Sequence, residues 1–272
     1  PCDWSSDVCS SDLVIFSDLD GTLLNDNKEV SKENKKAIEY FIENGGKFSI
    51  ATGRAIDSVS KYIEGVKTDL PIITYNGGTI YDYNKKKIIS EKVLDKDKKA
   101  LACKIADDYE NIGVEIYVGK DVYVLKDNGM SDRQATRLLN LKYDVPENIF
   151  DLSWNKITTI GKIGLMDEVE SEFYNKYKTK AIRSGECFVE IVPDNASKGD
   201  ALNEIIKTYN LDKKKVICAG DNMNDLELLM EAGISFCPEN ASNEVKKYAN
   251  HITVNNNEHI IPNIIKWIET NL

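Results

Sequence analysis

Two aspartates one residue apart, Asp18 and Asp20, end the first apolar run of the chain, VIFSDLDGT. Side chains alternate along a strand, so both carboxylates leave the strand end on one side, and Gly21 lets the backbone turn at once. At about 4 Å two like charges repel by roughly 4 kcal/mol at an effective dielectric constant of 20, so the pair requires a cation. Mg²⁺ prefers oxygen ligands and phosphate-bearing substrates, and it is the expected cofactor. The pattern therefore predicts an aspartate that attacks phosphorus beside a bound Mg²⁺.

Three further polar clusters follow, at 52–54 (TGR), 197–199 (SKG) and 220–225 (GDNMND). Ligands of an open α/β sheet bind at the carboxyl ends of its strands. The hydroxyl of Thr52 and the helix start after it suit a phosphate group. The ammonium of Lys198 can neutralise a phosphoryl oxygen, and the third cluster supplies more oxygen ligands for a metal.

Each cluster taken alone has a plain structural explanation. The first aspartate pair can form a solvated turn, Lys198 can be a surface lysine, and the segment 220–225 can cap a helix. Four such clusters in this order, each after a predicted strand of the α/β part, favour a single site instead.

The elements that must position these clusters follow from the hydrophobic pattern. Short apolar runs alternate with amphipathic segments over 14–80 and again over 190–272, which is typical of βαβ units and a parallel sheet. Strands are expected from Val14 to the first aspartates and at 47–52, 70–75, 216–219, 234–237 and 251–254. Helices are expected after a Ser31 cap and at 55–64, 198–209, 225–231 and 260–270. The fold class is α/β, with a Rossmann-like parallel sheet.

The hydrophobic pattern of the sequence changes between residues 81 and 189. Strand signals, among them 115–118, 121–124 and 157–163, are separated by two helical stretches at 96–110 and 168–177. We expect an α+β cap domain inserted into the α/β core.

The composition and net charge of the chain limit the classes of molecule that it can bind. The chain has 272 residues and a formal net charge of −10, which argues against nucleic acid and against an anionic membrane surface. No stretch of about 20 apolar residues is present. The six cysteines have no zinc or CxxC spacing, and those at 103, 187, 218 and 237 are expected to be buried thiols, which indicates a reducing cytoplasm. With only two histidines, a Ser-His-Asp mechanism is nearly excluded.

The segment 1–13, PCDWSSDVCSSDL, has no structural periodicity and lacks the basic start and apolar stretch of a signal peptide. It resembles translated sequencing adapter. We expect it to be non-native and exclude it from the fold.

The four clusters together resemble the motifs of the haloacid dehalogenase (HAD) superfamily of phosphatases. The insert between the second and third motifs is similar to that of the Cof-type subfamily, which carries a type IIB cap. The resemblance implies that Asp18 forms an aspartyl-phosphate, while Asp20 protonates the leaving oxygen and then activates water. An ordinary aspartic acid has a pKa near 3.9, so this role requires neighbouring carboxylates or desolvation to raise the pKa of Asp20.

The same resemblance implies a ligand set. Mg²⁺ would be held by the Asp18 carboxylate, the Asp20 main-chain carbonyl and Asp221, with Asp225 in the inner or outer shell. Lys198 would assist catalysis. Phosphate or substrate contacts are expected from Leu19, Thr52, Gly53, Arg54, Asn76, Gly77, Arg183, Lys198 and Asn224.

Three functions remain open at this point. The first is a Mg²⁺-dependent phosphomonoesterase of small cytosolic metabolites, chiefly sugar phosphates, acting as a monomer or weak homodimer. The second is a phosphomutase related to phosphomannomutases, and the third is a non-catalytic phosphoacceptor or ligand-binding protein. The physiological substrate is not readable from the residues.

Overall fold

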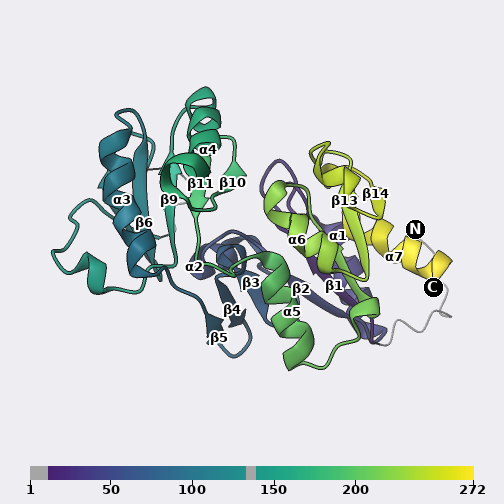
Figure 1. The fold of residues 1–272 in the computed structure, drawn as a ribbon. Helices are drawn as coiled ribbons and strands as arrows, with labels where there is room; N and C mark the ends of the chain where they lie inside the picture. The colour runs from purple at the N-terminus through teal and green to yellow at the C-terminus, as the bar shows by residue number, and fades with distance from the viewer. Residues whose placement is uncertain (1–11, 133–138) are drawn as a thin grey trace.

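A five-stranded parallel sheet in the order β14-β13-β12-β1-β2 forms the centre of the core in the computed structural model, which describes residues 12–132 and 139–272 (Figure 1). Its strands are β1 (Val14–Ser17), β2 (Lys47–Ile50), β12 (Val216–Ala219), β13 (Ile234–Pro238) and β14 (His251–Thr253). The central strand β1 pairs in parallel with both neighbours, so that Val14 lies opposite Val216 on one side and Lys47 on the other. The carboxyl ends of β1 and β12 therefore lie next to each other.

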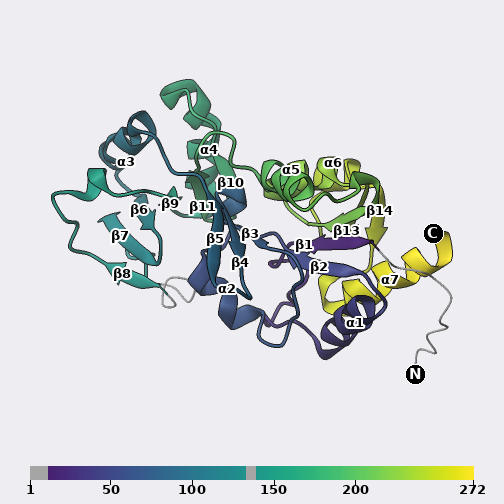
Figure 2. The same cartoon turned by 90° about the horizontal axis from the view of Figure 1, so that it is seen from below.

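Helices cover both faces of this sheet, because β1 is apolar on both sides. Helices α1 (Lys32–Glu43) and α7 (Ile260–Asn271) pack against the face that contains Ile15. Helices α5 (Lys198–Thr208) and α6 (Leu226–Glu231) pack against the face that contains Phe16. Figure 2 shows the two helix pairs on opposite sides of the sheet. This arrangement confirms the predicted α/β class.

Local signals set the helix ends. The side chain of Ser31 accepts a hydrogen bond from the backbone N–H of Asn34, which confirms Ser31 as the cap of α1. Ser197 caps α5 in the same way, through the backbone N–H of Asp200. The second of these caps fixes the start of the helix that carries Lys198.

A small antiparallel sheet joins the core to the rest of the chain. It contains β3 (Ile72–Thr74), β4 (Thr79–Asp82) and β5 (Lys87–Glu91) in that order. A bridge between Ala51 and Ile73 connects it to the end of β2, and the short helix α2 (Ile56–Tyr62) follows β2. A 3-10 turn, η1 (Tyr75–Gly77), lies between β3 and β4.

The second domain is built on a six-stranded sheet in the order β10-β11-β9-β6-β7-β8. We call this domain, residues 96–191, the cap. Its strands are β6 (Gly113–Val118), β7 (Asp121–Lys126), β8 (Asn140–Lys142), β9 (Lys156–Ile160), β10 (Ile182–Gly185) and β11 (Phe188–Ile191). Helices α3 (Lys96–Asp108) and α4 (Ile163–Tyr177) pack on one face, around Trp154 and Phe173. The other face is turned toward the core. The cap is the predicted α+β insert, whereas its expected limits of 81 and 189 stay a prediction.

Two local expectations are wrong. The strand expected over 157–163 ends at Ile160, and α4 begins at Ile163 rather than near 168, because Lys162 already takes the extended conformation of an N-cap residue. Among the cysteines, Cys103 is exposed and Cys187 is half-buried, although Cys218 and Cys237 are buried as expected.

Within the described residues, no helix has both the length and the apolar character that crossing a membrane requires. Most of the predicted non-native segment, together with Cys2 and Cys9, lies outside the described residues.

Candidate active site

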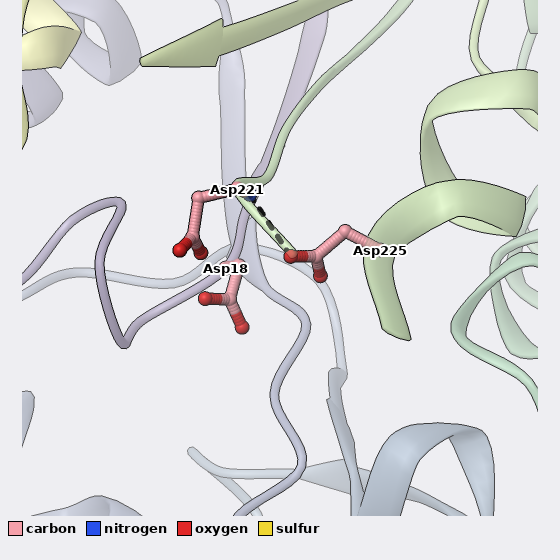
Figure 3. A group of neighbouring side chains, drawn as sticks. All are labelled: Asp18, Asp221 and Asp225. Carbon is pink, nitrogen blue, oxygen red and sulfur yellow. Dashed lines mark hydrogen bonds between the residues drawn. The ribbon is translucent and has the colours of Figure 1, made fainter. Parts of the chain in front are cut away.

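Three aspartates meet where β1 and β12 end. Asp18 follows β1 directly, while Asp221 and Asp225 follow β12 and lie on the turn that leads into α6. Each contributes a carboxylate oxygen to a group whose members all lie within 4.8 Å of one another (Figure 3). The backbone N–H groups of Asp221 and Asn222 donate to Asp225 Oδ2 at 3.0 and 3.1 Å, and they fix that carboxylate. The adjacent strand ends thus bring together residues about 200 positions apart in sequence.

Lys198 lies behind these carboxylates and is fully buried. Its Nζ donates to Asp18 Oδ1 at 2.6 Å and to Asp225 Oδ1 at 2.5 Å. Burial disfavours the charged ammonium, but Asp18 and Asp225 together outweigh it and raise the pKa of Lys198. The lysine is therefore a permanent cation that holds one oxygen of Asp18 in place.

One lysine does not neutralise three carboxylates, of which Asp18 and Asp225 are buried and Asp221 is half-buried. Burial and the neighbouring Asp225 charge raise the pKa of Asp18 well above its usual range, although Lys198 opposes this. Burial, followed by the charge of Asp225, raises the pKa of Asp221 to about 7. Burial and the neighbouring carboxylates thus both disfavour ionisation here, and oxygen donors at this spacing suit a hard divalent cation. The donor set therefore fits Mg²⁺.

Gly21 makes room for this group. It has a φ of +80°, and a Cβ there would lie 2.4 Å from Asp221 Oδ2. The hydroxyl of Thr22 donates to the other oxygen of Asp221 at 3.1 Å. The turn after Asp20 thus approaches the carboxylate so closely that only glycine fits.

Asp20 is held differently from its neighbours. Arg54 donates to both of its carboxylate oxygens, from Nε at 2.6 Å and from Nη2 at 2.7 Å, and Lys28 donates to one of them at 3.1 Å. Burial favours the neutral acid, but the hydrogen bonds and charge of Arg54 and Lys28 outweigh it and lower the pKa of Asp20. The expectation of a raised pKa is therefore wrong for this arrangement, in which Asp20 is an anion.

The second motif lies next to the aspartates. Thr52 is buried, and its hydroxyl accepts a hydrogen bond from the backbone N–H of Arg54 at 3.2 Å. Gly53 packs against the amide of Asn76, since a Cβ on Gly53 would lie 2.7 Å from Asn76 Oδ1. The side chain of Leu19 is buried in the core, so only its main chain is available to a phosphate group.

Two asparagines link the core motifs to the cap. Asn224 Nδ2 donates to Asn76 Oδ1 at 3.0 Å, and Asn76 Nδ2 donates to Glu190 Oε2 at 3.0 Å. Asn76 adopts a left-handed conformation with φ of 54°. Both the oxygen and the nitrogen of the Asn76 amide, which we expect to contact substrate, therefore form hydrogen bonds to protein side chains.

Gly77 is a packing residue in the structure. Its φ is +91°, and a Cβ at this position would lie 1.9 Å from the carbonyl oxygen of Ser197. The turn η1 can therefore rest directly on the backbone that precedes Lys198.

Arg183 does not reach the site. Its guanidinium pairs with Asp167 at 3.0 Å and Glu170 at 3.3 Å on α4, and Nε donates to the carbonyl of Gly185 at 2.7 Å. Arg183 is not among the described residues that line the cavity, and its expected contact with substrate stays a prediction.

A cavity of about 320 Å³ opens over Asp18 between the core and the cap. Seven of the expected site residues line it: Asp18, Asp20, Thr52, Gly53, Arg54, Asp221 and Asn224. The cap contributes Tyr117, Leu139, Lys156, Thr158, Ser184, Gly185, Phe188 and Glu190. Sequence reasoning missed Lys156, Thr158 and Glu190. The available signal was a charged residue inside or beside an otherwise apolar strand, as in Val189-Glu190-Ile191.

Comparison with known proteins agrees with this site. The family model described as haloacid dehalogenase-like hydrolase matches residues 15–265. The chain belongs to this family. Within it, the HAD chain is 28% identical over 275 residues to the 5-amino-6-(5-phospho-D-ribitylamino)uracil phosphatase YwtE of Bacillus subtilis (strain 168), with 90% of this chain and 94% of that protein covered.

Solved structures give the same result for the fold. A haloacid dehalogenase-like hydrolase from Bacteroides thetaiotaomicron is 26% identical, with a TM-score of 0.80 over 94% of this chain and 99% of that one. The HAD subclass IIB sugar phosphatase BT4131 has a TM-score of 0.80 over the same shares at 20% identity, which shows likeness of fold alone. The family match and the curated relatives together identify this protein as a Cof-type phosphatase.

Proposed function

We propose that this phosphatase is a Mg²⁺-dependent phosphomonoester hydrolase that acts on small phosphorylated metabolites, sugar phosphates above all, through an aspartyl-phosphate on Asp18. One observation carries the proposal: the Asp18 carboxylate faces the cavity, while a buried lysine, Lys198, holds one of its oxygens at 2.6 Å. The second carboxylate oxygen is then left for attack on phosphorus.

The proposed reaction has two steps. In the first, an Asp18 oxygen bonds to phosphorus, the bond between phosphorus and the ester oxygen breaks, and the leaving oxygen takes a proton. In the second, water attacks the same phosphorus and phosphate leaves Asp18. Thr52 and Asn224 line the cavity beside Asp18, and in this proposal they hold phosphoryl oxygens. Lys198 acts through the Asp18 carboxylate to which it donates. Asp20 serves as the acid and then the base only after its carboxylate leaves Arg54, because the ion pair keeps it ionised.

The metal ligands of this proposal are Asp18, Asp221 and the main-chain carbonyl of Asp20, with Asp225 beside them. A bound Mg²⁺ supplies positive charge that offsets the carboxylates and the phosphoryl group. Lys198 alone cannot do this, as the raised pKa of Asp221 indicates.

The names of similar proteins and the volume of the cavity support the proposed substrate class. The similar Bacillus subtilis protein is named for a phosphoribityl substrate, and the similar solved structure BT4131 is named a sugar phosphatase. The cavity of about 320 Å³ lies at the lower end of the range typical of small-ligand sites. A reducing cytoplasm agrees with the free thiols of the described cysteines, and we propose a monomer or weak homodimer there.

The central test is Asp18→Asn. We expect phosphate release from p-nitrophenyl phosphate to fall by about 10³-fold or more, because the amide is a poor nucleophile. Asp57→Asn is the matched control, since Asp57 is an exposed aspartate in the first turn of α2. Full turnover by Asp18→Asn contradicts the proposal.

A panel of phosphorylated metabolites, assayed with Mg²⁺ and with chelator, tests the other parts. We expect inorganic phosphate from sugar monophosphates with Mg²⁺ and little release with chelator. An isomerised hexose phosphate as product would indicate a mutase instead. A long-lived acyl-phosphate without phosphate release would indicate a phosphoacceptor.

A further inference from the structure

The cap sheet presents a polar face to the cavity. Its strands alternate, so residues such as Ile116, Ile157 and Val189 pack under α3 and α4. The intervening positions form the opposite face and carry Glu115, Tyr117, Lys156, Thr158 and Glu190. All five are buried, with exposed fractions of 5% or less. A buried face with this much polarity is unusual in a sheet and requires partners.

Strand register places these side chains side by side. Thr158 on β9 lies opposite Glu115 on β6 and opposite Glu190 on β11. Tyr117 lies opposite Lys156 in the same way, and its hydroxyl donates to Glu115 Oε2 at 3.0 Å. The polar groups therefore form one continuous patch across three strands.

Lys156 and Glu190 form a buried ion pair in this patch. Lys156 Nζ donates to Glu190 Oε1 at 2.6 Å, and it lies 3.4 Å from the carbonyl oxygen of Gly53. It also lies 4.7 Å from the centre of the Tyr117 ring. These two residues are the only charged ones that the described cap residues contribute to the cavity lining. The charges of Lys156 and Glu190 therefore offset each other in the described part of the cavity lining.

Thr158 is the member of the patch that lacks a partner. It lines the cavity, its hydroxyl is buried, and that hydroxyl has no hydrogen-bond partner among the residues that the structure describes. The next residue shows the contrast, because the hydroxyl of Thr159 donates to the carbonyl of Val189 at 2.8 Å. An unsatisfied buried hydroxyl is unfavourable, and a ligand hydroxyl in the cavity would satisfy it.

From these contacts we infer that Thr158, with the Lys156–Glu190 pair beside it, forms a subsite for a polyhydroxylated leaving group. The inference rests on the proposed function, since the phosphoryl group must occupy the core side of the same cavity. Ligand hydroxyls exchange hydrogen bonds with Thr158 and the ion pair, and the ring of Tyr117 provides an apolar surface.

Thr158→Val tests the role of the hydroxyl. Valine has nearly the same shape, and the hydroxyl that it removes makes no hydrogen bond to the described protein, so folding is retained. We expect the ratio of kcat/KM for glucose 6-phosphate or ribitol 5-phosphate to kcat/KM for p-nitrophenyl phosphate to fall about 10-fold. Thr159→Val is the matched control and leaves this ratio unchanged, because its hydroxyl bonds to Val189 on the backbone. An unchanged ratio in Thr158→Val overturns the inference.

A substrate comparison with the unaltered enzyme completes the test. We expect phosphate release from glucose 6-phosphate or ribitol 5-phosphate as well as from p-nitrophenyl phosphate. Turnover of p-nitrophenyl phosphate without turnover of any polyol monophosphate also overturns the subsite but keeps the phosphatase. Loss of phosphate release from every substrate, the aryl phosphate included, contradicts the proposed function itself.

Discussion

The two walls of the cavity are built in different ways. On the core wall, Asp18 and Asp225 follow strand ends or helix starts, and backbone N–H groups and Lys198 hold them. On the cap wall, Lys156, Thr158 and Glu190 lie within strands β9 and β11, and only the pairing register brings them together. The core wall carries a group of three carboxylates, whereas the charged residues among the described cap residues of the lining form one ion pair. The proposed roles assign chemistry to the core wall and choice of leaving group to the cap wall, so substitutions should affect them separately.

The largest effect is expected for Lys198→Met, which breaks the core wall. Two buried carboxylates lose their cation, so the free energy of unfolding should fall by about 3–5 kcal/mol with chelator present. Phosphate release should fall by about 10²-fold or more for aryl and sugar substrates alike. Urea denaturation and a phosphate assay measure the two effects. Lys207→Met, an exposed position on the same helix, is the control, and similar behaviour of the two variants would refute the role given to Lys198.

A smaller effect is expected for Gly77→Ala, which disturbs the support of the core wall. The new methyl group would meet the carbonyl of Ser197, and the backbone keeps a positive φ. The combined strain should cost about 2–4 kcal/mol of stability and reduce turnover of all substrates.

Gly119→Ala separates the two causes. Gly119 also has a positive φ, of +57°, but no atom lies within 4 Å of an added Cβ there. It should therefore lose only about 1 kcal/mol by urea denaturation. Equal losses in the two variants would show that contact with Ser197 is unimportant.

The smallest effect is expected for Tyr75→Phe, which weakens the contact between the walls. The Tyr75 hydroxyl donates to the carbonyl of Gly119 in the cap, and its ring packs with Tyr117 and Val122. Loss of this hydrogen bond should cost about 1 kcal/mol, equivalent to about fivefold more frequent separation of cap and core. Amide hydrogen exchange in the turn between β6 and β7 should rise accordingly. Tyr40→Phe loses a hydrogen bond to Glu269 within the core and should leave exchange in this turn unaltered.

The core wall is largely predictable because its signals are local. Ser31 and the strand Val216–Ala219 lie where the sequence places them, and the aspartates follow strands that are visible as apolar runs. The cap wall is not predictable in this way, because the Lys156–Glu190 pair depends on β9 lying beside β11 after α4 intervenes.

Side-chain partners explain the remaining differences. Arg183 forms ion pairs with Asp167 and Glu170 on α4. These pairs depend on how α4 packs against β10, and the residues next to Arg183 in sequence do not reveal that packing. The same holds for Asp20. Its sequence neighbours suggest a raised pKa, but the pairing with Arg54, 34 residues away, reverses the shift.

The strand order of the core sheet has a consequence for synthesis on the ribosome. The central strand β1 needs β12 as a neighbour, and Val14 pairs with Val216, about 200 residues later in the chain. At roughly 5–20 residues per second, β1 waits about 10–40 s for that partner. The cap is continuous in sequence and emerges complete during this interval. The nascent chain thus holds an unfinished core beside a finished cap, and Asp18 acquires Lys198 only when the last quarter of the chain appears.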